Sequence, residues 1–461
     1  MIARAALAYA PPMPHRRASL STPRDHVRGG LCGTGLVLLL FALGSPLAVR
    51  AQTITDNDFE VDAVDGPVLG SSREVGMGGA YTALASGAAG APFNPAAFAS
   101  RELYEYEPWA WDIAFSWFFP GVGGANDFFD NGRRGVDTSG FQFIDIGGRI
   151  QFKEGGAGVL VRTLNYHVPF DASTRFDVNL ITAHGGLAYG LLDGQLTIGL
   201  GVRVADMSVA LVHLDSRAAA NDKLISFTGL GGEAGFILGL TSMPFRIGAT
   251  VRMPVDSRVA PDDPSAGTTD VSGILLPRTV HLPWEVEAGI AWQLGPKPLN
   301  ARFLRYKRVV PRVLQQLSGR EGAADAAAEA QDEVEHEAYV RRRSLERRYV
   351  LLSASLLFIG STSDGVGIDA FLEQQRRTRG RNISFSLRLG AEAEIVPDWV
   401  KLRAGFYIEP ARQTGVAPRP HVTVGTDVRL FTLFGTTVRG TFTLDGAPRY
   451  ADVGVGVGVW H

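Results

Sequence analysis

Apolar residues alternate strictly with polar or small residues over segments of about ten positions, and such segments recur along most of the chain. Residues 196–205 set Leu, Ile, Leu, Val and Val against Thr, Gly, Gly, Arg and Ala. A period of two is typical of a β-strand whose two faces meet different surroundings. Soluble strands usually run about 5–6 residues, whereas strands that cross a bilayer need about ten. The same period returns in residues 285–294, 383–390, 400–409, 422–430 and 453–459.

The face between the apolar residues mixes Gly, Thr, Arg and Glu, which is typical of a barrel lumen. A soluble β-sandwich with one wet face is the alternative, although its strands would be shorter. The sequence therefore predicts an all-β fold, a transmembrane antiparallel β-barrel of about 14 strands. The expected strands are 109–119, 141–153, 157–168, 178–192, 195–210, 224–240, 245–254, 280–294, 349–361, 382–396, 400–410, 421–431, 436–444 and 449–460.

The connections between these strands alternate in length. Short ones are expected at 154–156, 193–194, 242–244, 397–399 and 432–435. Outer-membrane barrels have short periplasmic turns and longer outer loops, so the order of turns places both ends of the barrel on the periplasmic side. Long connections are expected near 120–140, 169–177, 211–223, 255–279, 362–381 and 411–420.

The first 51 residues predict a cleaved signal peptide. Four arginines between positions 16 and 28 precede the apolar run 35–44, and small residues at 49 and 51 allow cleavage before Gln52. A membrane anchor is the alternative, but the apolar run is short for a helical span. Cys32 is the only cysteine, which excludes a disulfide framework and a cysteine-based zinc site. Together with the strands, this segment predicts export to the bacterial outer membrane, where the barrel contacts lipid.

Residues 300–348 interrupt the barrel pattern where a short periplasmic turn is expected. A basic stretch near 302–312 precedes an acidic stretch at 321–337 and a second basic stretch at 341–343. The segment is rich in Ala, Glu and Arg, which favour helices. We interpret it as a helical periplasmic insertion. It is either a solvated insertion without a partner or a docking element for a periplasmic protein.

Charge and motif content restrict the function further. The 45 basic and 47 acidic residues nearly cancel, so the chain lacks the basic footprint of a nucleic-acid-binding protein. It contains no G-x-S-x-G, H-E-x-x-H or Walker sequence. We therefore expect no enzyme activity, no cofactor and no metal site, and we expect a monomer. Alternation along the strands instead directs a set of charged side chains into the lumen, where they are expected to pair: Arg203, Glu233, Arg246, Arg252, Glu287, Arg388, Glu392, Arg403 and Arg429.

The segment after the signal peptide contains too many small residues, glycine above all, to form a lipid-facing strand. It contains Ser71-Ser72 and, four residues on, Gly76-Met77-Gly78-Gly79-Ala80-Tyr81, and it closes on Asn94-Pro95-Ala96. This segment resembles the N-terminal hatch of the FadL/TodX family of outer-membrane transporters for hydrocarbons and long-chain fatty acids. It also resembles the PorV-like branch, which shares the fold and can serve protein secretion.

The resemblance implies a hatch over residues 52–108 and a barrel over 109–461, with 300–348 inserted into it. It implies a gating role for the motif residues Gly76, Met77, Gly78, Gly79, Asn94, Pro95 and Ala96. The function it implies is passive uptake of a hydrophobic small molecule, either a long-chain fatty acid or a hydrocarbon. The alternative is a PorV-like scaffold or secretion component that binds a protein and transports nothing.

Overall fold

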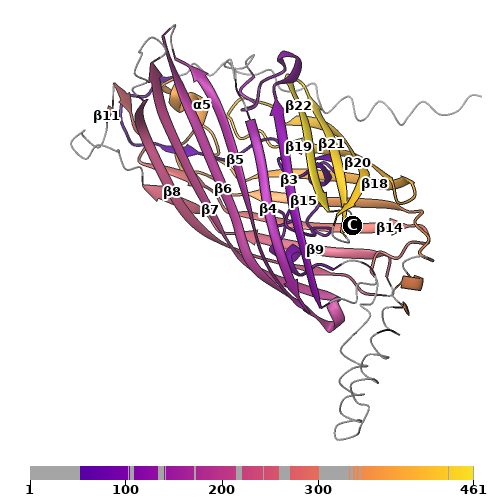
Figure 1. The fold of residues 1–461 in the computed structure, drawn as a ribbon. Helices are drawn as coiled ribbons and strands as arrows, with labels where there is room; N and C mark the ends of the chain where they lie inside the picture. The colour runs from indigo at the N-terminus through magenta and orange to yellow at the C-terminus, as the bar shows by residue number, and fades with distance from the viewer. Residues whose placement is uncertain are drawn as a thin grey trace, which may run out of the picture. The chain divides into compact units, whose positions relative to one another are not determined.

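Fourteen strands of the described residues close into one antiparallel barrel in the computed structural model, as predicted (Figure 1). The structure describes residues 52–459 except 102, 104–107, 133–139, 141, 171–172, 214–220, 242, 259–269, 272, 301–331, 333–335, 338, 342–343 and 434–435. The expected signal peptide and most of the expected insertion lie outside these residues. The barrel strands are β3 (Trp109–Pro120), β4 (Gln142–Phe152), β5 (Gly155–Pro169), β6 (Thr174–Leu191), β7 (Leu196–His213), β8 (Asn221–Leu238), β9 (Phe245–Arg252), β14 (Glu285–Leu294), β15 (Val350–Ile359), β18 (Ser384–Val396), β19 (Val400–Glu409), β20 (Arg419–Leu433), β21 (Thr436–Ala447) and β22 (Tyr450–Val459).

Two sequence expectations about the strands are wrong. Residues 280–294 do not form one strand, because β13 (Thr279–Leu282) leaves the barrel and only β14 continues it. Pro283 lies at the break, and proline lacks the N–H that a ladder requires. The loop expected at 169–177 is shorter than predicted, since β5 ends at Pro169 and β6 begins at Thr174.

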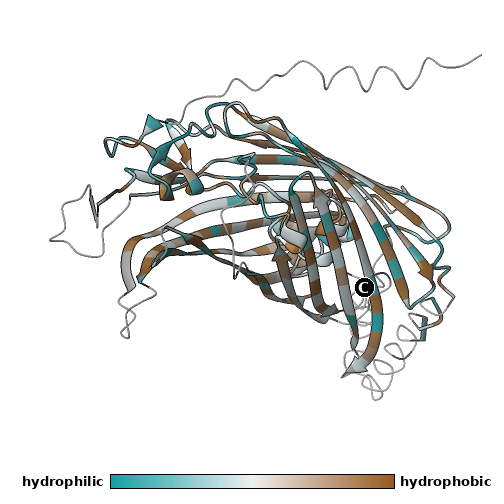
Figure 2. Ribbon diagram, turned by 90° about the horizontal axis from the view of Figure 1, so that it is seen from above, coloured by the Kyte–Doolittle hydropathy of each residue, from teal (hydrophilic) through white to brown (hydrophobic). Residues whose placement is uncertain are grey.

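The outer face of the barrel carries a band of exposed apolar side chains. On β6 the band runs from Ile181 through Leu187 and Tyr189 to Leu191, all pointing outward. Ten residues of a strand tilted by about 40° rise roughly 25 Å, which is the height of the apolar band in outer-membrane barrels. Figure 2 shows the apolar residues interrupted by polar ones along the barrel strands.

The two faces of β5 to β8 exchange character near the long-loop end. Beyond Ile181 the outward residues of β6 are Asn179, Asp177 and Arg175, while the inward residues are apolar. On β7 the outward Val204 gives way to Asp206 in the same way. This part of the wall therefore extends past the apolar band, with a wet outer face and an apolar lining.

A group of short strands, which we call the cap, packs inside the barrel against this apolar lining. The four-stranded sheet of the cap has the order β10 (Val255–Arg258), β13, β2 (Glu60–Asp62) and β16 (Gly365–Gly367). Strand β2 comes from the N-terminal segment and pairs in parallel with both β13 and β16. Helix α5 (Ile368–Leu372) and the pair of β1 (Gln52–Thr53) with β17 (Gln375–Arg376) belong to the same region. The small hairpin of β11 (Asp270–Val271) and β12 (Ile274–Leu275) completes the strands.

From the cap, the N-terminal segment continues along the inside of the barrel to its short-turn end. It carries the short helix α2 (Ser72–Gly76) and the 3-10 helix η2 (Pro95–Ala99), whose residues are nearly all buried. The wall surrounds both, with α2 against β19 to β22 and η2 against β4 to β8. Two single 3-10 turns, η3 (Val122–Gly124) and η4 (Leu192–Gly194), lie in connections. Among the described residues, no helix has the length and hydrophobicity required to cross a membrane.

Candidate functional site: the hatch and its cavity

The first hatch motif lies against strands β18, β19 and β20. Gly78 and Gly79 adopt φ angles of +59° and +73°, a backbone region that favours glycine. A Cβ built on Gly78 would lie 2.8 Å from the backbone nitrogen of Phe406, and one on Gly76 would lie 2.9 Å from Cα of Gly425. Met77 is fully buried beside them. The motif therefore forms a tight turn whose backbone touches the barrel wall.

Glycines of the wall make this close approach possible. A Cβ on Gly405 would lie 2.2 Å from the nitrogen of Gly78, and one on Gly390 would lie 2.5 Å from the carbonyl oxygen of Met77. Real Cβ atoms do not approach backbone atoms so closely, so these sites admit glycine alone while the hatch is docked. The small residues of the inward face thus accommodate the hatch backbone.

The second hatch motif, Asn94-Pro95-Ala96, contacts the opposite wall. Oδ1 of Asn94 accepts a hydrogen bond from the backbone N–H of Ala96 at 3.0 Å and so caps η2. Nδ2 of Asn94 donates to the carbonyl oxygens of Thr82 at 3.1 Å and Phe236 at 2.9 Å. One amide thereby connects η2, the hatch and β8. Pro95, the first residue of η2, supplies a fixed φ there.

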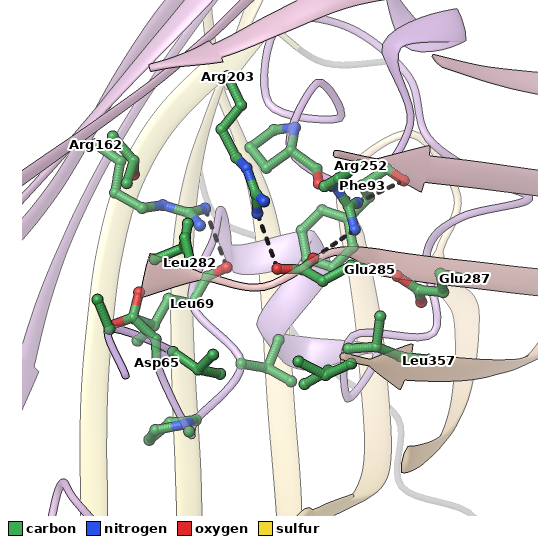
Figure 3. Close-up of a pocket in the computed structure, with 18 of the residues that line it drawn as sticks. Asp65, Leu69, Phe93, Arg162, Arg203, Arg252, Leu282, Glu285, Glu287 and Leu357 are labelled. Carbon is green, nitrogen blue, oxygen red and sulfur yellow. Dashed lines mark hydrogen bonds and ion pairs between the residues drawn. The ribbon is translucent and has the colours of Figure 1, made fainter. Parts of the chain in front are cut away.

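A cavity of about 130 Å³ lies between hatch residues 63–69 and the inner wall. Its apolar lining includes Leu69, Leu282 and Leu357, and charged side chains complete it (Figure 3). The charged and polar lining residues are Asp65, Arg162, Thr182, His184, Arg203, Arg252, Glu285, Glu287 and Arg388.

Ion pairs hold the charged lining in place. Glu285 accepts hydrogen bonds from Arg203 and from Arg252, each at 2.9 Å (Figure 3). Arg252 also donates to the carbonyl oxygen of Phe93 at 3.0 Å, which fixes the hatch to the wall. Burial raises the pKa of the hatch residue Asp65 to about 6, against the opposing charges of Arg162 and Arg379.

The expected luminal charges are distributed over three places. Glu287 contacts Arg388, and Glu233 contacts His184 at 3.0 Å, beside the cavity. Arg246 bonds Asn300 at the short-turn end. Arg429 contacts Asp398 in the β18–β19 turn, because β19 begins opposite Val428 and Arg429 therefore lies level with the turn. The remaining pair, Glu392 and Arg403, forms part of the cluster that grips α2.

This cluster, which we call the Glu392 latch, consists of Glu392, Arg403, Asp427 and the hatch residue Arg73. Arg73 donates to both carboxylate oxygens of Glu392, at 2.9 and 3.0 Å. Nε of Arg403 bonds the same carboxylate at 2.6 Å, and its two Nη atoms bond Asp427 at 2.6 and 2.7 Å. Asp427 also accepts a hydrogen bond from Arg439 at 2.7 Å, so the two carboxylates bind three guanidinium groups in this site.

Several charged residues that hold the hatch or line the cavity were not predicted from the sequence. Arg162 lies at an inward position of a correctly predicted strand, so the alternation rule could have included it. Arg73 and Asp65 lie in the hatch, where no period shows which way a side chain points. His421, placed between Asp445 at 2.9 Å and Glu409 at 2.8 Å, also lies on the inward face of its strand.

The described residues contain no group of three or more His, Cys, Asp or Glu side chains that could hold a metal ion. The site is instead a docked plug, a cavity beside it and ion pairs that join the plug to the wall. Chemically, such a site can hold an amphipathic molecule, with apolar contacts on one side and guanidinium groups on the other.

Comparison with known proteins gives structural neighbours alone. No protein-family model matches the chain, and no curated protein matches it. A FadL homologue from Pseudomonas aeruginosa aligns at 10% identity over 86% of this chain and 99% of its own, with a TM-score of 0.49. The toluene transporter TodX of Pseudomonas putida aligns at 11% identity over 88% and 99%, with a TM-score of 0.44. The CymD monoaromatic hydrocarbon channel aligns at 12% identity over 86% of this chain and 96% of its own, with a TM-score of 0.47.

Proposed function

We propose that the protein is an outer-membrane channel for the passive uptake of small hydrophobic molecules. The observation that carries the proposal is the cavity between hatch and wall inside a lipid-facing barrel. A molecule held there contacts both the hatch and the barrel wall. The apolar band and the closed barrel support placement in the outer membrane, and we propose that the short turns face the periplasm.

The size and chemistry of the cavity narrow the class of ligand. An engineered apolar cavity of about 150 Å³ in another protein holds benzene. A cavity of about 130 Å³ therefore suits a single ring or a short alkyl segment, and a long acyl chain would need the hatch to move. Because guanidinium groups line part of it, we propose an amphipathic ligand, apolar at one end and polar or anionic at the other.

The contacts between hatch and wall support a model in which the hatch moves. Its motif turns lie on glycine surfaces and its ties to the wall include the Arg73–Glu392 pair and the bonds of Asn94. Such contacts are polar and directional, so a hatch displaced by a few ångströms loses them together. We therefore propose that the hatch leaves its seat as a unit.

The test is a matched pair of tryptophan substitutions on β15. Leu357 lines the cavity, whereas its neighbour Leu356 points outward into the apolar band and is 36% exposed. Leu357→Trp fills the cavity, while Leu356→Trp adds an indole to the lipid face, where aromatic residues are common. The measurement is native mass spectrometry of protein extracted gently from its own outer membrane, repeated after incubation with 4-ethylphenol or octanoate.

We expect the wild type and Leu356→Trp to carry a small molecule or take up a probe, and Leu357→Trp to carry neither. Equal binding by both variants would contradict the cavity as the ligand site. The scaffold alternative has its own support, because the cap fills the long-loop end of the lumen. A wild-type barrel that is empty, binds neither probe and copurifies with a stoichiometric protein would favour the scaffold.

A further inference from the structure

The two stems of the β14–β15 connection are fixed to the inside of the barrel. We define the stems as residues 295–300 and 344–349, which flank the segment 301–343. Asn300 of the first stem donates through Nδ2 to the carbonyl oxygens of Met243 and Phe245, each at 2.9 Å. Arg347 of the second stem contacts Asp398 at 2.8 Å. Each stem therefore leaves the barrel from a defined position.

The second stem also reaches the Glu392 latch. The hydroxyl of Tyr349 donates to Oε1 of Glu392 at 2.8 Å, the same oxygen that accepts from Nη2 of Arg73. Nζ of Lys297, in the first stem, lies 4.3 Å from the centre of the Tyr349 ring and 3.8 Å from Glu394. Both stems thus contact the tyrosine or the carboxylates beside it.

Apolar packing follows the same route. Leu299 and Tyr349 belong to a buried cluster with hatch residues Tyr81 and Leu84. The hydroxyl of Tyr81 lies 3.0 Å from that of Ser86, and the guanidinium of Arg73 lies 5.4 Å from the Tyr81 ring. Stem and hatch therefore share one polar and one apolar contact region.

We propose that the two stems control the hatch through Tyr349 and Glu392, so that displacement of the stems from the short-turn side loosens the hold of Glu392 on Arg73. The carboxylate of Glu392 binds two arginines and the tyrosine together. When Tyr349 leaves, the carboxylate loses one donor and the packing that orients it toward α2. The proposal rests on the proposed channel function, because it assigns that channel a release operated from the periplasmic side.

The experiment measures hatch movement without any ligand, so that its failure and the failure of the channel proposal can be distinguished. In a chain carrying Cys32→Ser, Ser72→Cys places a single thiol in α2, at a side chain that is buried. A charged, membrane-impermeant maleimide reacts with this thiol only when α2 leaves the wall. The rate of labelling in detergent-solubilised full-length protein then reports the open fraction.

Tyr349→Phe removes the bond to Glu392 and keeps the ring, and we expect it to raise the labelling rate at least tenfold. Tyr450→Phe is the matched control, because Tyr450 is also a buried tyrosine and no hydrogen bond of its hydroxyl is found among the described residues. We expect this control to label at the wild-type rate. Heat-modifiable gel mobility checks that each variant retains its barrel.

Coupling between two sites is reciprocal, so the hatch must also act on the stems. We expect Arg73→Gln to speed amide hydrogen exchange in residues 295–300 and 344–349 and to leave the turn at 153–154 unchanged. A wild-type labelling rate in Tyr349→Phe would overturn the proposal, and so would unchanged exchange in the stems of Arg73→Gln. Faster labelling in Tyr349→Phe and Tyr450→Phe alike would also overturn it, since it would indicate general loosening.

Discussion

Single glycines on the wall decide whether the hatch can dock. A methyl group on Gly405 would meet the nitrogen of Gly78 at 2.2 Å and the carbonyl carbon of Met77 at 2.5 Å, and Oγ1 of Thr423 at 2.4 Å. Overpacking of this kind costs about 1–3 kcal/mol. We therefore predict that Gly405→Ala weakens hatch docking by that amount while the barrel still forms. The measurement is the labelling rate of the Ser72→Cys thiol, which should rise by roughly tenfold to hundredfold.

Gly446→Ala is the control for this prediction. Gly446 also lies in a barrel strand, but a Cβ there would meet its nearest neighbour, the carbonyl oxygen of Val422, at 4.0 Å. We expect Gly446→Ala to label at the wild-type rate. If Gly405→Ala did the same, the hatch backbone could not lie as close to β19 as the structure places it.

At the scale of the strand, the exchange of faces along β7 makes a prediction about depth in the membrane. Leu200 and Ser208 both point outward, but Leu200 lies within the apolar band and is 69% exposed, whereas Ser208 lies beyond Val204 on the wet part of the wall. An outward arginine costs about 2–4 kcal/mol at the centre of the bilayer and little near its surface. We predict that Leu200→Arg lowers the free energy of unfolding in lipid vesicles by that amount, and that Ser208→Arg changes it by less than about 1 kcal/mol.

Equal losses for the two arginine variants would mean that the apolar band reaches the top of β7.

The same strand also shows how far sequence could go. Alternation, strict in six segments and poor in 109–119 and 349–361, predicted fourteen strands, and the barrel formed by the described residues has fourteen, because every barrel strand separates two surroundings. It could not show the exchange of faces, because alternation persists when the apolar side changes from outward to inward, as it does after Val204.

The residues of the candidate site could also be predicted only in part. The motif residues of the hatch were named from their resemblance to a known family, and the inward charges from alternation. Their partners were not, because Arg73 and Glu392 lie 319 residues apart and only the closed barrel brings them together. The cap strand β2 was missed for the same reason. Three residues that pair in parallel with two distant loops carry no local period.

For the whole molecule, β2 connects the hatch to the cap over the lumen. It is an inner strand of the sheet, with β13 on one side and β16 on the other, and Val61 within it is fully buried. Asp62 at its end binds Arg412 at 2.9 Å. Removing residues 52–62 would leave β13 and β16 with unpaired backbone edges and the Arg412 guanidinium without this carboxylate, which is costly in a buried place.

We therefore predict that the chain lacking residues 52–62 still forms the barrel, since every barrel strand begins after residue 108, but loses the packed cap. Limited proteolysis should cut the connections at 253–284 and 360–383 at least ten times faster than in the full-length protein, while the turn at 397–399 stays protected. Heat-modifiable mobility should be unchanged. If the two connections resisted proteolysis equally in the truncated and the full-length protein, the outer loops would hold the cap together by themselves. Strand β2 would then pair with the cap sheet without stabilising it.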